Sequence, residues 1–244
     1  MKTFNIHGLV NPISMRRDLH QCLQSFFDRH LPLGSVVYDI GCGQKPFASY
    51  LKGKVKVHVG VDLVDGFYKT DQVDLIGSAY EVPAPDGIAD AVILSQVIEH
   101  LETPLQAIRE CHRLLKPGGL MFLSFPFLYP VHVEPRDFLR FTEHYLRQEI
   151  ASQAFEVVES KQLGGYWYLT GMYAAMYLQD LDRGPLRTLR VVKVVSAMAQ
   201  LVCLGLHKLE GMLLSAAGKD PERVRARWSV NHVTVLRKTE VTTC

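Results

Sequence analysis

The stretch that decides the fold is VVYDIGCGQKPFASYL, residues 36–51. An apolar, strand-like run leads into an acidic residue and two glycines, and FASYL after them predicts the start of a helix. In a sheet of parallel strands, a turn of this kind lies at the carboxyl end of a strand, where ligands bind. Gly41 and Gly43 let a ligand approach the backbone closely, because no Cβ intervenes. Pro46 replaces the third glycine of G-x-G-x-x-G, which favours a ligand that has no pyrophosphate to seat.

Around this turn, strand-like and helix-like stretches alternate. The pattern predicts helices at 14–30 and about 104–115, the second one ended by KPGG at 116–119, and strands at 35–40, 55–63, 89–96 and 120–127. It predicts two later strands, at 155–165 and 228–239, separated by a mainly helical insertion at about 166–226. Strands alternating with helices at this spacing indicate βαβ units and a parallel sheet.

Composition narrows the class of protein. The 244 residues include 27 basic and 25 acidic side chains mixed along the chain, with a net charge of +2 and 48% hydrophobic residues. The concentrated positive face that binding to a nucleic-acid backbone needs is therefore not indicated. The five cysteines are scattered without a C-x-x-C pair, which argues against a disulfide framework and a thiolate zinc site. No metal site is expected, and the N-terminus lacks a signal-peptide pattern, so a cytoplasmic location is expected.

Asp62 is the candidate residue for holding a ribose. It ends the second strand-like run, VGVD, and a carboxylate at such a strand end can accept hydrogen bonds from vicinal ribose hydroxyls. A tight turn followed by a solvated aspartate is the alternative interpretation, which the two glycines and Asp62 alone leave open.

Several motifs in order resemble a known family. VVYDIGCG, VGVDL, IADAVILSQVIEHLETP, CHRLLKPGGLMFLSFP and the terminal VTVLRKT are similar to class I S-adenosylmethionine-dependent methyltransferases, close to the type-11 group. The resemblance covers about residues 35–160 and the final strand. It implies a Rossmann-like α/β fold, with a seven-stranded mixed sheet whose last strand is antiparallel and helices on both faces. It also implies S-adenosylmethionine as cofactor and S-adenosylhomocysteine as product.

The resemblance assigns cofactor contacts residue by residue. The methionine part would be held by Asp39 and the backbone of Gly41, Cys42 and Gly43, and the ribose and adenine side by Asp62 and Leu63. The family often has an aspartate where this chain has Ser78, so the backbone of Ser78, Ala79 and Tyr80 would replace that contact. Gln96 would line the pocket near the sulfonium. His100 belongs to the same motif, and a structural role at a helix start is equally open for it.

The segment FPFLYPVHVEPRDFLRFTEHYLRQEI, 125–150, holds the candidate catalytic residues. His132 is the candidate proton acceptor, because histidine titrates near neutral pH, and Asp137 would orient it or pair with Arg140. Alternatively, PRDFLRFT begins a helix in which Asp137 and Arg140 form an ordinary i, i+3 pair. The fourth strand ends in LSQV rather than in the Asn/Asp-Pro-Pro-aromatic signature of nucleic-acid amino-methyltransferases. The sequence therefore favours a small-molecule or glycan-type acceptor.

The insertion is apolar and rich in aromatics. Its tyrosines and tryptophan at 164–178 could roof an acceptor pocket, but a core or homodimer face is favoured. The run at 191–206, interrupted by Lys193, is short for a bilayer span and is interpreted as a buried helix or, less favoured, one on a membrane surface near a lipid-linked acceptor. We expect one methyltransferase domain over 1–244, with an N-terminal helical segment (1–33), a cofactor core (34–165), the insertion as an acceptor lid (166–226) and a final strand and tail (227–244).

The predicted function is methyl transfer from S-adenosylmethionine to a hydroxyl by direct displacement. Two other classes stay open at this stage. One is a non-catalytic S-adenosylmethionine-binding partner or regulatory protein, and the other is a protein or RNA methyltransferase that docks through the insertion.

Overall fold

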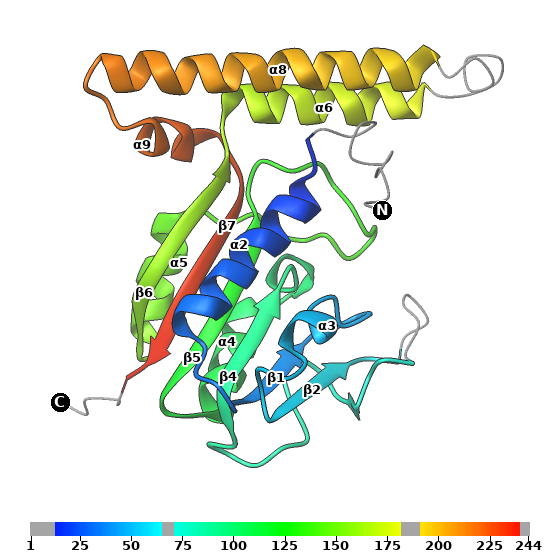
Figure 1. Ribbon diagram of the computed structural model, residues 1–244. Coiled ribbons are helices and arrows are strands. Elements are labelled where there is room, and N and C mark those ends of the chain that lie inside the picture. The colour runs from blue at the N-terminus through cyan, green and yellow to red at the C-terminus, as the bar shows by residue number, and fades with distance from the viewer. Residues whose placement is uncertain (1–12, 65–70, 182–190, 240–244) are drawn as a thin grey trace. The chain divides into compact units, whose positions relative to one another are not determined.

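The computed structural model describes residues 13–64, 71–181 and 191–239, and within them one sheet has the strand order β3-β2-β1-β4-β5-β7-β6 (Figure 1). Strands β1, β2, β3, β4 and β5 pair in parallel, and β7 runs antiparallel to β5. The strands are β1 (Val36–Ile40), β2 (Val57–Asp62), β3 (Leu75–Ile76), β4 (Ala89–Ser95), β5 (Leu115–Pro126), β6 (Phe155–Gly164) and β7 (Ser229–Lys238). The expected seven-stranded mixed sheet with an antiparallel last strand is confirmed.

Helices follow the strands in the expected alternation. They are α2 (Met15–His30), α3 (Ala48–Leu51), α4 (Pro104–Leu114), α5 (Glu143–Ser152), α6 (Tyr166–Asp180), α8 (Val191–Ala216) and α9 (Pro221–Arg225), with 3₁₀ turns η1 (Ile98–His100) and η2 (Ala226–Trp228). Helix α4 begins with a proline, whose fixed φ suits the first helical position. The helices predicted at 14–30 and 104–115 are confirmed.

The chain divides into two compact units. One contains the sheet core, with the described residues from 20–161 and 231–239, and the other contains the described residues from 13–19 and 162–230. In the first unit, β1, β4 and β5 are almost entirely buried. This burial explains why these strands read as continuous apolar runs rather than alternating ones.

Two elements of the sheet differ from the sequence prediction. Strand β5 starts at Leu115, earlier than the predicted 120, because Leu115 pairs with Ala89 before the register shifts at Ala91. The sequence KPGG lies within this irregular start, where Gly118 has φ +73°, rather than in a separate turn. Strand β3 has two residues, too few to show any periodicity, so the sequence did not predict it.

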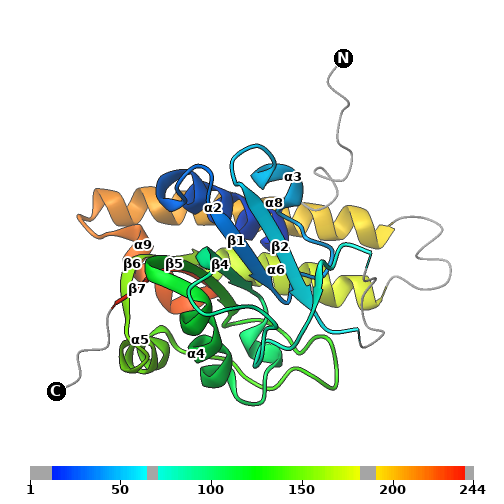
Figure 2. The ribbon, with the colours of Figure 1, turned by 90° about the horizontal axis from the view of Figure 1, so that it is seen from below.

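In the second unit, α6 and α8 pack side by side as an antiparallel hairpin (Figures 1 and 2). Gly171 is at the contact, since a Cβ there would lie 2.9 Å from the Cβ of Cys203. On the buried side of α8, the amide of Gln200 accepts a hydrogen bond from the backbone N–H of Ile13 at 2.9 Å and donates one to the Ser196 hydroxyl at 3.2 Å. Close packing at Gly171 therefore holds α6 against α8, and the Gln200 amide joins the backbone at Ile13 to α8.

The outer side of α8 is apolar and exposed. Of the most apolar window of this 26-residue helix, 22% is buried. The exposed residues include Val194, Val195, Met198, Leu201 and Val202. The favoured interpretation of a buried core helix is therefore wrong, and so is the estimate that the segment is too short for a membrane. Among the described residues, α8 is the one helix that is long and apolar enough to cross a bilayer by length and composition.

Candidate functional site

The glycine turn is hydrogen-bonded to the end of strand β2. The backbone N–H groups of Gly41 and Cys42 donate to the Val61 carbonyl at 2.8 and 3.2 Å, and that of Gly43 donates to the Asp62 carboxylate at 2.7 Å. Both glycines have positive φ, +67° and +50°. At Gly41 a Cβ would lie 2.5 Å from a methyl group of Val97. The turn thus requires glycine at position 41 for space as well as for conformation.

Asp62 ends β2 beside this turn. Its second carboxylate oxygen accepts the backbone N–H of Leu63 at 2.7 Å, and the Leu63 side chain is exposed. A carboxylate has about four acceptor positions on its two oxygens. Asp62 can therefore keep both backbone hydrogen bonds and still accept two hydroxyl donors of a ligand.

Asp39 lies within the sheet rather than at its rim. Its side chain is buried, and one carboxylate oxygen is 3.2 Å from Nε2 of His58. Burial raises the pKa of Asp39, and the hydrogen bond to His58 partly offsets that effect. The Asp39 carboxyl thus contacts the neighbouring strand β2 through His58, two residues before the first glycine of the turn.

Lys45 and Asp74 make a second set of polar contacts to β2, which was not predicted from the sequence. The Lys45 ammonium donates to the His58 carbonyl at 3.0 Å and to Asp74 at 2.5 Å, and Asp74 also accepts the Gly60 N–H at 2.6 Å. Lys45 belongs to the glycine turn itself, so its position was a usable signal. Nothing local in the sequence marks Asp74, because it reaches β2 from the far side of a long connection.

The segment after β3 forms a tight turn. The Ser78 hydroxyl accepts the backbone N–H of Tyr80 at 3.2 Å, and the Ser78 carbonyl accepts that of Glu81 at 3.1 Å. Ala79 is half-buried, and the Tyr80 hydroxyl accepts the N–H of Thr103 at 3.3 Å. The Ser78 side chain is thus engaged by its own turn, which leaves an adenine contact to backbone groups.

Gln96 follows β4 in the left-handed region, with φ +58°. Its backbone N–H donates to the Ser124 carbonyl at 2.9 Å, and its amide donates to the Asn231 side chain at 2.9 Å. A non-glycine residue in this region costs on the order of 1 kcal/mol and is found often at functional sites. Asn231, from the last strand, was missed because it is distant in sequence.

The loop between β5 and α5 brings His132, Asp137 and Arg140 together. Asp137 is almost fully buried and receives two hydrogen bonds from the Arg140 guanidinium at 2.5 and 2.7 Å. It also accepts the His132 backbone N–H at 2.8 Å. The pKa of Asp137 is lowered to about 2, mainly by the hydrogen bonds from the Arg140 guanidinium. Burial opposes this shift, and the hydrogen bond from the His132 backbone N–H adds to it. The alternative that this segment begins a helix is wrong, because α5 starts at Glu143.

The ring orientation of His132 follows from its neighbours. Nδ1 lies 3.1 Å from Asp137 Oδ2 and 3.3 Å from the Pro130 carbonyl, whereas the Arg140 nitrogen is 3.5 Å away. Because two acceptors are closer to Nδ1 than the donor, we assign the proton to Nδ1. Nε2 is then the basic nitrogen of His132.

Glu99 and His100 in η1 contact the same loop. The Glu99 side chain is fully buried, neither carboxylate oxygen has a hydrogen-bond partner among the described residues, and burial raises its pKa to about 8. Its backbone carbonyl accepts the N–H groups of Phe138 and Leu139 at 2.9 and 3.2 Å. His100 Nδ1 lies 2.6 Å from the Arg136 carbonyl. The sequence analysis considered His100 and missed Glu99, although the two are adjacent in the same motif.

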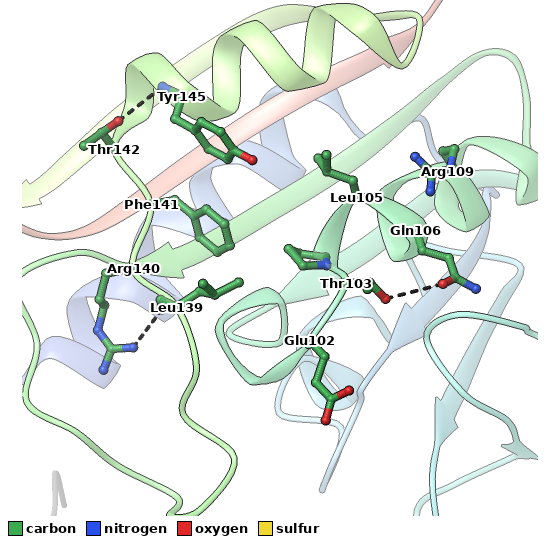
Figure 3. Close-up of a pocket in the computed structure, with 11 residues that line it drawn as sticks. Glu102, Thr103, Leu105, Gln106, Arg109, Leu139, Arg140, Phe141, Thr142 and Tyr145 are labelled. Carbon is green, nitrogen blue, oxygen red and sulfur yellow. Dashed lines mark hydrogen bonds between the residues drawn. The ribbon is translucent and has the colours of Figure 1, made fainter.

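A surface pocket of about 620 Å³ lies beside this loop (Figure 3). Leu105 and Arg109 of α4 line one side, and Phe141 and Tyr145 line the other. Arg140 also borders it, whereas the predicted cofactor residues do not. The pocket is therefore a neighbour of the His132 loop and is separate from the glycine turn.

Comparison with known proteins connects this geometry to a family. Residues 38–123 match the family model described as a methyltransferase domain. A probable S-adenosylmethionine-dependent methyltransferase of Mycolicibacterium smegmatis is 33% identical over 103 residues, which are 40% of each chain. A ubiquinone biosynthesis O-methyltransferase of Thiobacillus denitrificans is 29% identical over 127 residues, 47% of this chain and 51% of that one. The chain thus spans about half the length of the curated relatives it matches, or less.

The fold has solved counterparts. A putative sarcosine dimethylglycine methyltransferase from Galdieria sulphuraria superposes with a TM-score of 0.55 at 17% identity, covering 93% of this chain and 85% of that chain. Identity this low supports the shared fold alone. The matched family segment begins within β1 and ends within β5, so it contains the glycine turn, Asp62 and the Glu99–His100 turn.

Proposed function

Because residues 38–123 are a class I S-adenosylmethionine-dependent methyltransferase domain, we propose that the chain methylates a hydroxyl of a small-molecule or glycan-type acceptor. S-adenosylmethionine is the cofactor of this domain and S-adenosylhomocysteine its product. The hydrogen bond that joins the Gly43 N–H to Asp62 supports this proposal most directly. It sets a ribose acceptor beside a turn that lacks the third glycine of a pyrophosphate site.

In the proposed cofactor site, Asp62 accepts the ribose hydroxyls and the backbone from Gly41 to Gly43 lies against the methionine part. Leu63 and the Ser78–Tyr80 turn border the adenine, with Gln96 near the sulfonium. Asp39 supports the strand end before the turn, since its carboxyl is buried and bonded to His58. His100 is assigned to the loop rather than to the cofactor, because its ring contacts the Arg136 carbonyl.

The proposed reaction is a direct displacement at the methyl carbon. The acceptor oxygen forms a bond to that carbon while the carbon–sulfur bond breaks, and the electron pair stays on sulfur. His132 Nε2 accepts the hydroxyl proton, Asp137 fixes the ring through Nδ1, and Arg140 holds Asp137 in place. The relatives named as ubiquinone biosynthesis O-methyltransferases support a hydroxyl acceptor. The non-catalytic alternative and a protein or RNA acceptor have less support.

Compartment and partners extend this proposal. Four of the cysteines are buried free thiols, which supports a reducing, cytoplasmic setting: Cys22, Cys42, Cys111 and Cys203. Cys244 lies outside the described residues.

The exposed apolar side of α8 supports association with a membrane surface. Flotation with neutral and anionic lipid vesicles would test that association, and a double Met198→Glu, Leu201→Glu variant should lose it. Equal recovery of both proteins with the vesicles would contradict it.

The test of the main proposal measures cofactor binding and transfer separately. Isothermal titration should show S-adenosylmethionine binding that Asp62→Ala weakens by about 10²–10⁴-fold, since two hydrogen bonds to a charged group contribute about 1.5–3 kcal/mol each. Transfer of labelled methyl groups to the small-molecule fraction of a cell extract should follow. Absence of cofactor binding would contradict the whole proposal, and label found solely in protein or RNA would contradict the acceptor.

A further inference from the structure

We propose that Glu99, His100 and His132 form a site for one divalent transition-metal ion, and that Zn²⁺ fits it best. Each residue offers one ligand atom, and these atoms lie within 4.8 Å of one another. Two imidazoles and one carboxylate are the donor set of open zinc sites, which keep a fourth position for water or substrate. The sequence predicts no metal site, because it has no cysteine pairs and the third ligand, His132, is remote from Glu99 and His100 in the chain.

The buried carboxyl group of Glu99 is the first observation that favours a bound cation. Glu99 is 0% exposed, and neither of its side-chain oxygens has a hydrogen-bond partner among the described residues. Burying an unpaired carboxylate is expensive, and buried charges in proteins are usually paired or bound to metals. The nearest basic atom is Nε2 of His100, 3.8 Å from Oε1. A cation between these two atoms would satisfy both.

The second observation is that both histidines are held through the other ring nitrogen. His100 Nδ1 lies 2.6 Å from the Arg136 carbonyl, and His132 Nδ1 lies 3.1 Å from the Asp137 carboxylate. Metal-binding histidines almost always donate their second ring N–H to a carbonyl or carboxylate, which fixes tautomer and orientation. Both rings here have such an acceptor, and each leaves Nε2 as the ligand.

The surrounding charges admit a cation. The Arg140 guanidinium lies 3.5 Å from Nδ1 of His132, and its two hydrogen bonds to Asp137 offset its charge. The site itself then has one carboxylate and two neutral imidazoles. Tetrahedral zinc with bonds of about 2.0–2.1 Å keeps its ligands about 3.4 Å apart, so the three side chains must close by roughly 1 Å. The Glu99 carbonyl already holds the loop through Phe138 and Leu139, which limits the movement to side chains.

The metal site deepens the proposed function. Its role in the reaction rests on that function, whereas metal binding itself does not. An acceptor hydroxyl at the open position would bind the ion, whose charge lowers the pKa of the hydroxyl. The O–H bond breaks with the proton leaving to water, and the oxygen then attacks the methyl carbon. In the metal-loaded protein His132 acts as a ligand, and in the metal-free protein the same Nε2 is the base.

Metal binding is tested directly on the full chain. Titration of the chelator-treated protein with ZnCl₂ should show one ion per chain, and thermal unfolding should shift upward with added Zn²⁺. Glu99→Gln, His100→Ala and His132→Ala should each weaken binding by at least about 10²-fold. Glu102→Gln and His144→Ala are the matched controls, because both side chains are exposed, and they should bind Zn²⁺ as the unmodified protein does. Glu99→Gln should fold normally, since glutamine has the shape of the glutamate it replaces.

Two results would overturn the site: no heat with ZnCl₂, or binding that survives both His100→Ala and His132→Ala. The proposed function is judged separately, by S-adenosylmethionine titration and label transfer with and without chelator. Zinc binding without cofactor binding would sink the function and keep the site. Cofactor binding and transfer without zinc binding would keep the function and remove the site. Transfer unaffected by chelator in a protein that binds zinc would keep the site and refute its chemical role.

Discussion

The glycine turn and the loop between β5 and α5 belong to the same unit. They differ in how fully their polar groups are hydrogen-bonded within the protein. In the turn, the Gly41, Cys42 and Gly43 N–H groups all have acceptors, and Asp62 joins the two strand ends. At the loop, Asp137 and Arg140 are paired, but the Glu99 carboxyl oxygens are buried without a hydrogen-bond partner among the described residues. The polar groups of the turn are thus satisfied within the protein, whereas the loop leaves one buried carboxyl group without a hydrogen bond.

The difference follows from how each region is built. The turn is made by strand ends whose spacing is fixed by the parallel ladder, so its polar groups meet backbone partners. The loop has no ladder, and its polar side chains have to satisfy one another. The turn, with its fixed backbone, provides a rigid surface for binding the cofactor. The loop provides the side chains that can react. We therefore expect cofactor affinity to depend on the turn and turnover to depend on the loop.

The largest expected effect separates these two roles. His132→Ala should lower turnover by about 10²–10⁴-fold, the usual contribution of a positioned acid or base, while S-adenosylmethionine affinity changes by less than about threefold. Initial rates of label transfer and cofactor titration on the same preparation measure the two quantities. His144→Ala, an exposed histidine of α5, is the control and should change neither. A parallel loss of cofactor affinity in His132→Ala would show that the division between turn and loop is wrong.

The next effect concerns the buried side chain of His232 and the pH dependence of stability. The His232 ring stacks on Phe125 at 5.1 Å and meets Phe127 edge-on at 5.6 Å, and burial lowers its pKa to about 4 despite the charge of Glu143. Histidine in the unfolded chain has a pKa of about 6.5. Below that pH the unfolded chain binds more protons, so stability should fall by about 3 kcal/mol between pH 6.5 and pH 4.

Urea unfolding at a series of pH values measures this loss. In His232→Gln, the part of the pH dependence that comes from this residue should disappear, and the decline between pH 6.5 and pH 4 should be shallower. His144→Gln should keep the decline of the unmodified protein. Identical profiles for all three proteins would mean that His232 takes up its proton equally in the folded and unfolded states.

The sequence predicts the turn better than the loop, for a physical reason. The glycines, the strand-end Asp62 and the alternation of strands and helices are local features, and each is confirmed in position within a few residues. The contacts of the turn that come from other strands, such as Asp74 with Gly60, were invisible, because they depend on which strands become neighbours in the sheet.

The loop shows the same limit more strongly. His132, Asp137 and Arg140 were expected to cluster because they are close in sequence, and the structure brings them together without a helix. Glu99 joins them from η1, and Gln96 is fixed by Asn231 from the last strand. Burial without a hydrogen-bond partner, the property that distinguishes Glu99, depends on the packing of the whole unit. Short sequence motifs do not reveal it.

The smallest expected effect tests whether the turn needs glycine because a Cβ would clash with a neighbour or because the backbone has a positive φ. Gly43→Ala places a Cβ in open space at φ +50° and should cost about 1 kcal/mol of stability, the penalty of a left-handed residue with a side chain. Gly41→Ala has the same penalty at φ +67° and adds a Cβ 2.5 Å from a Val97 methyl. Overpacking of this kind costs about 1–3 kcal/mol, so the two variants should differ by about 2 kcal/mol in urea unfolding. Val97→Ala should remove most of that difference when combined with Gly41→Ala, because the clashing methyl groups are gone. If the double variant is as unstable as the sum of the single ones, the turn is limited by conformation alone, and its closeness to Val97 contributes nothing to its rigidity.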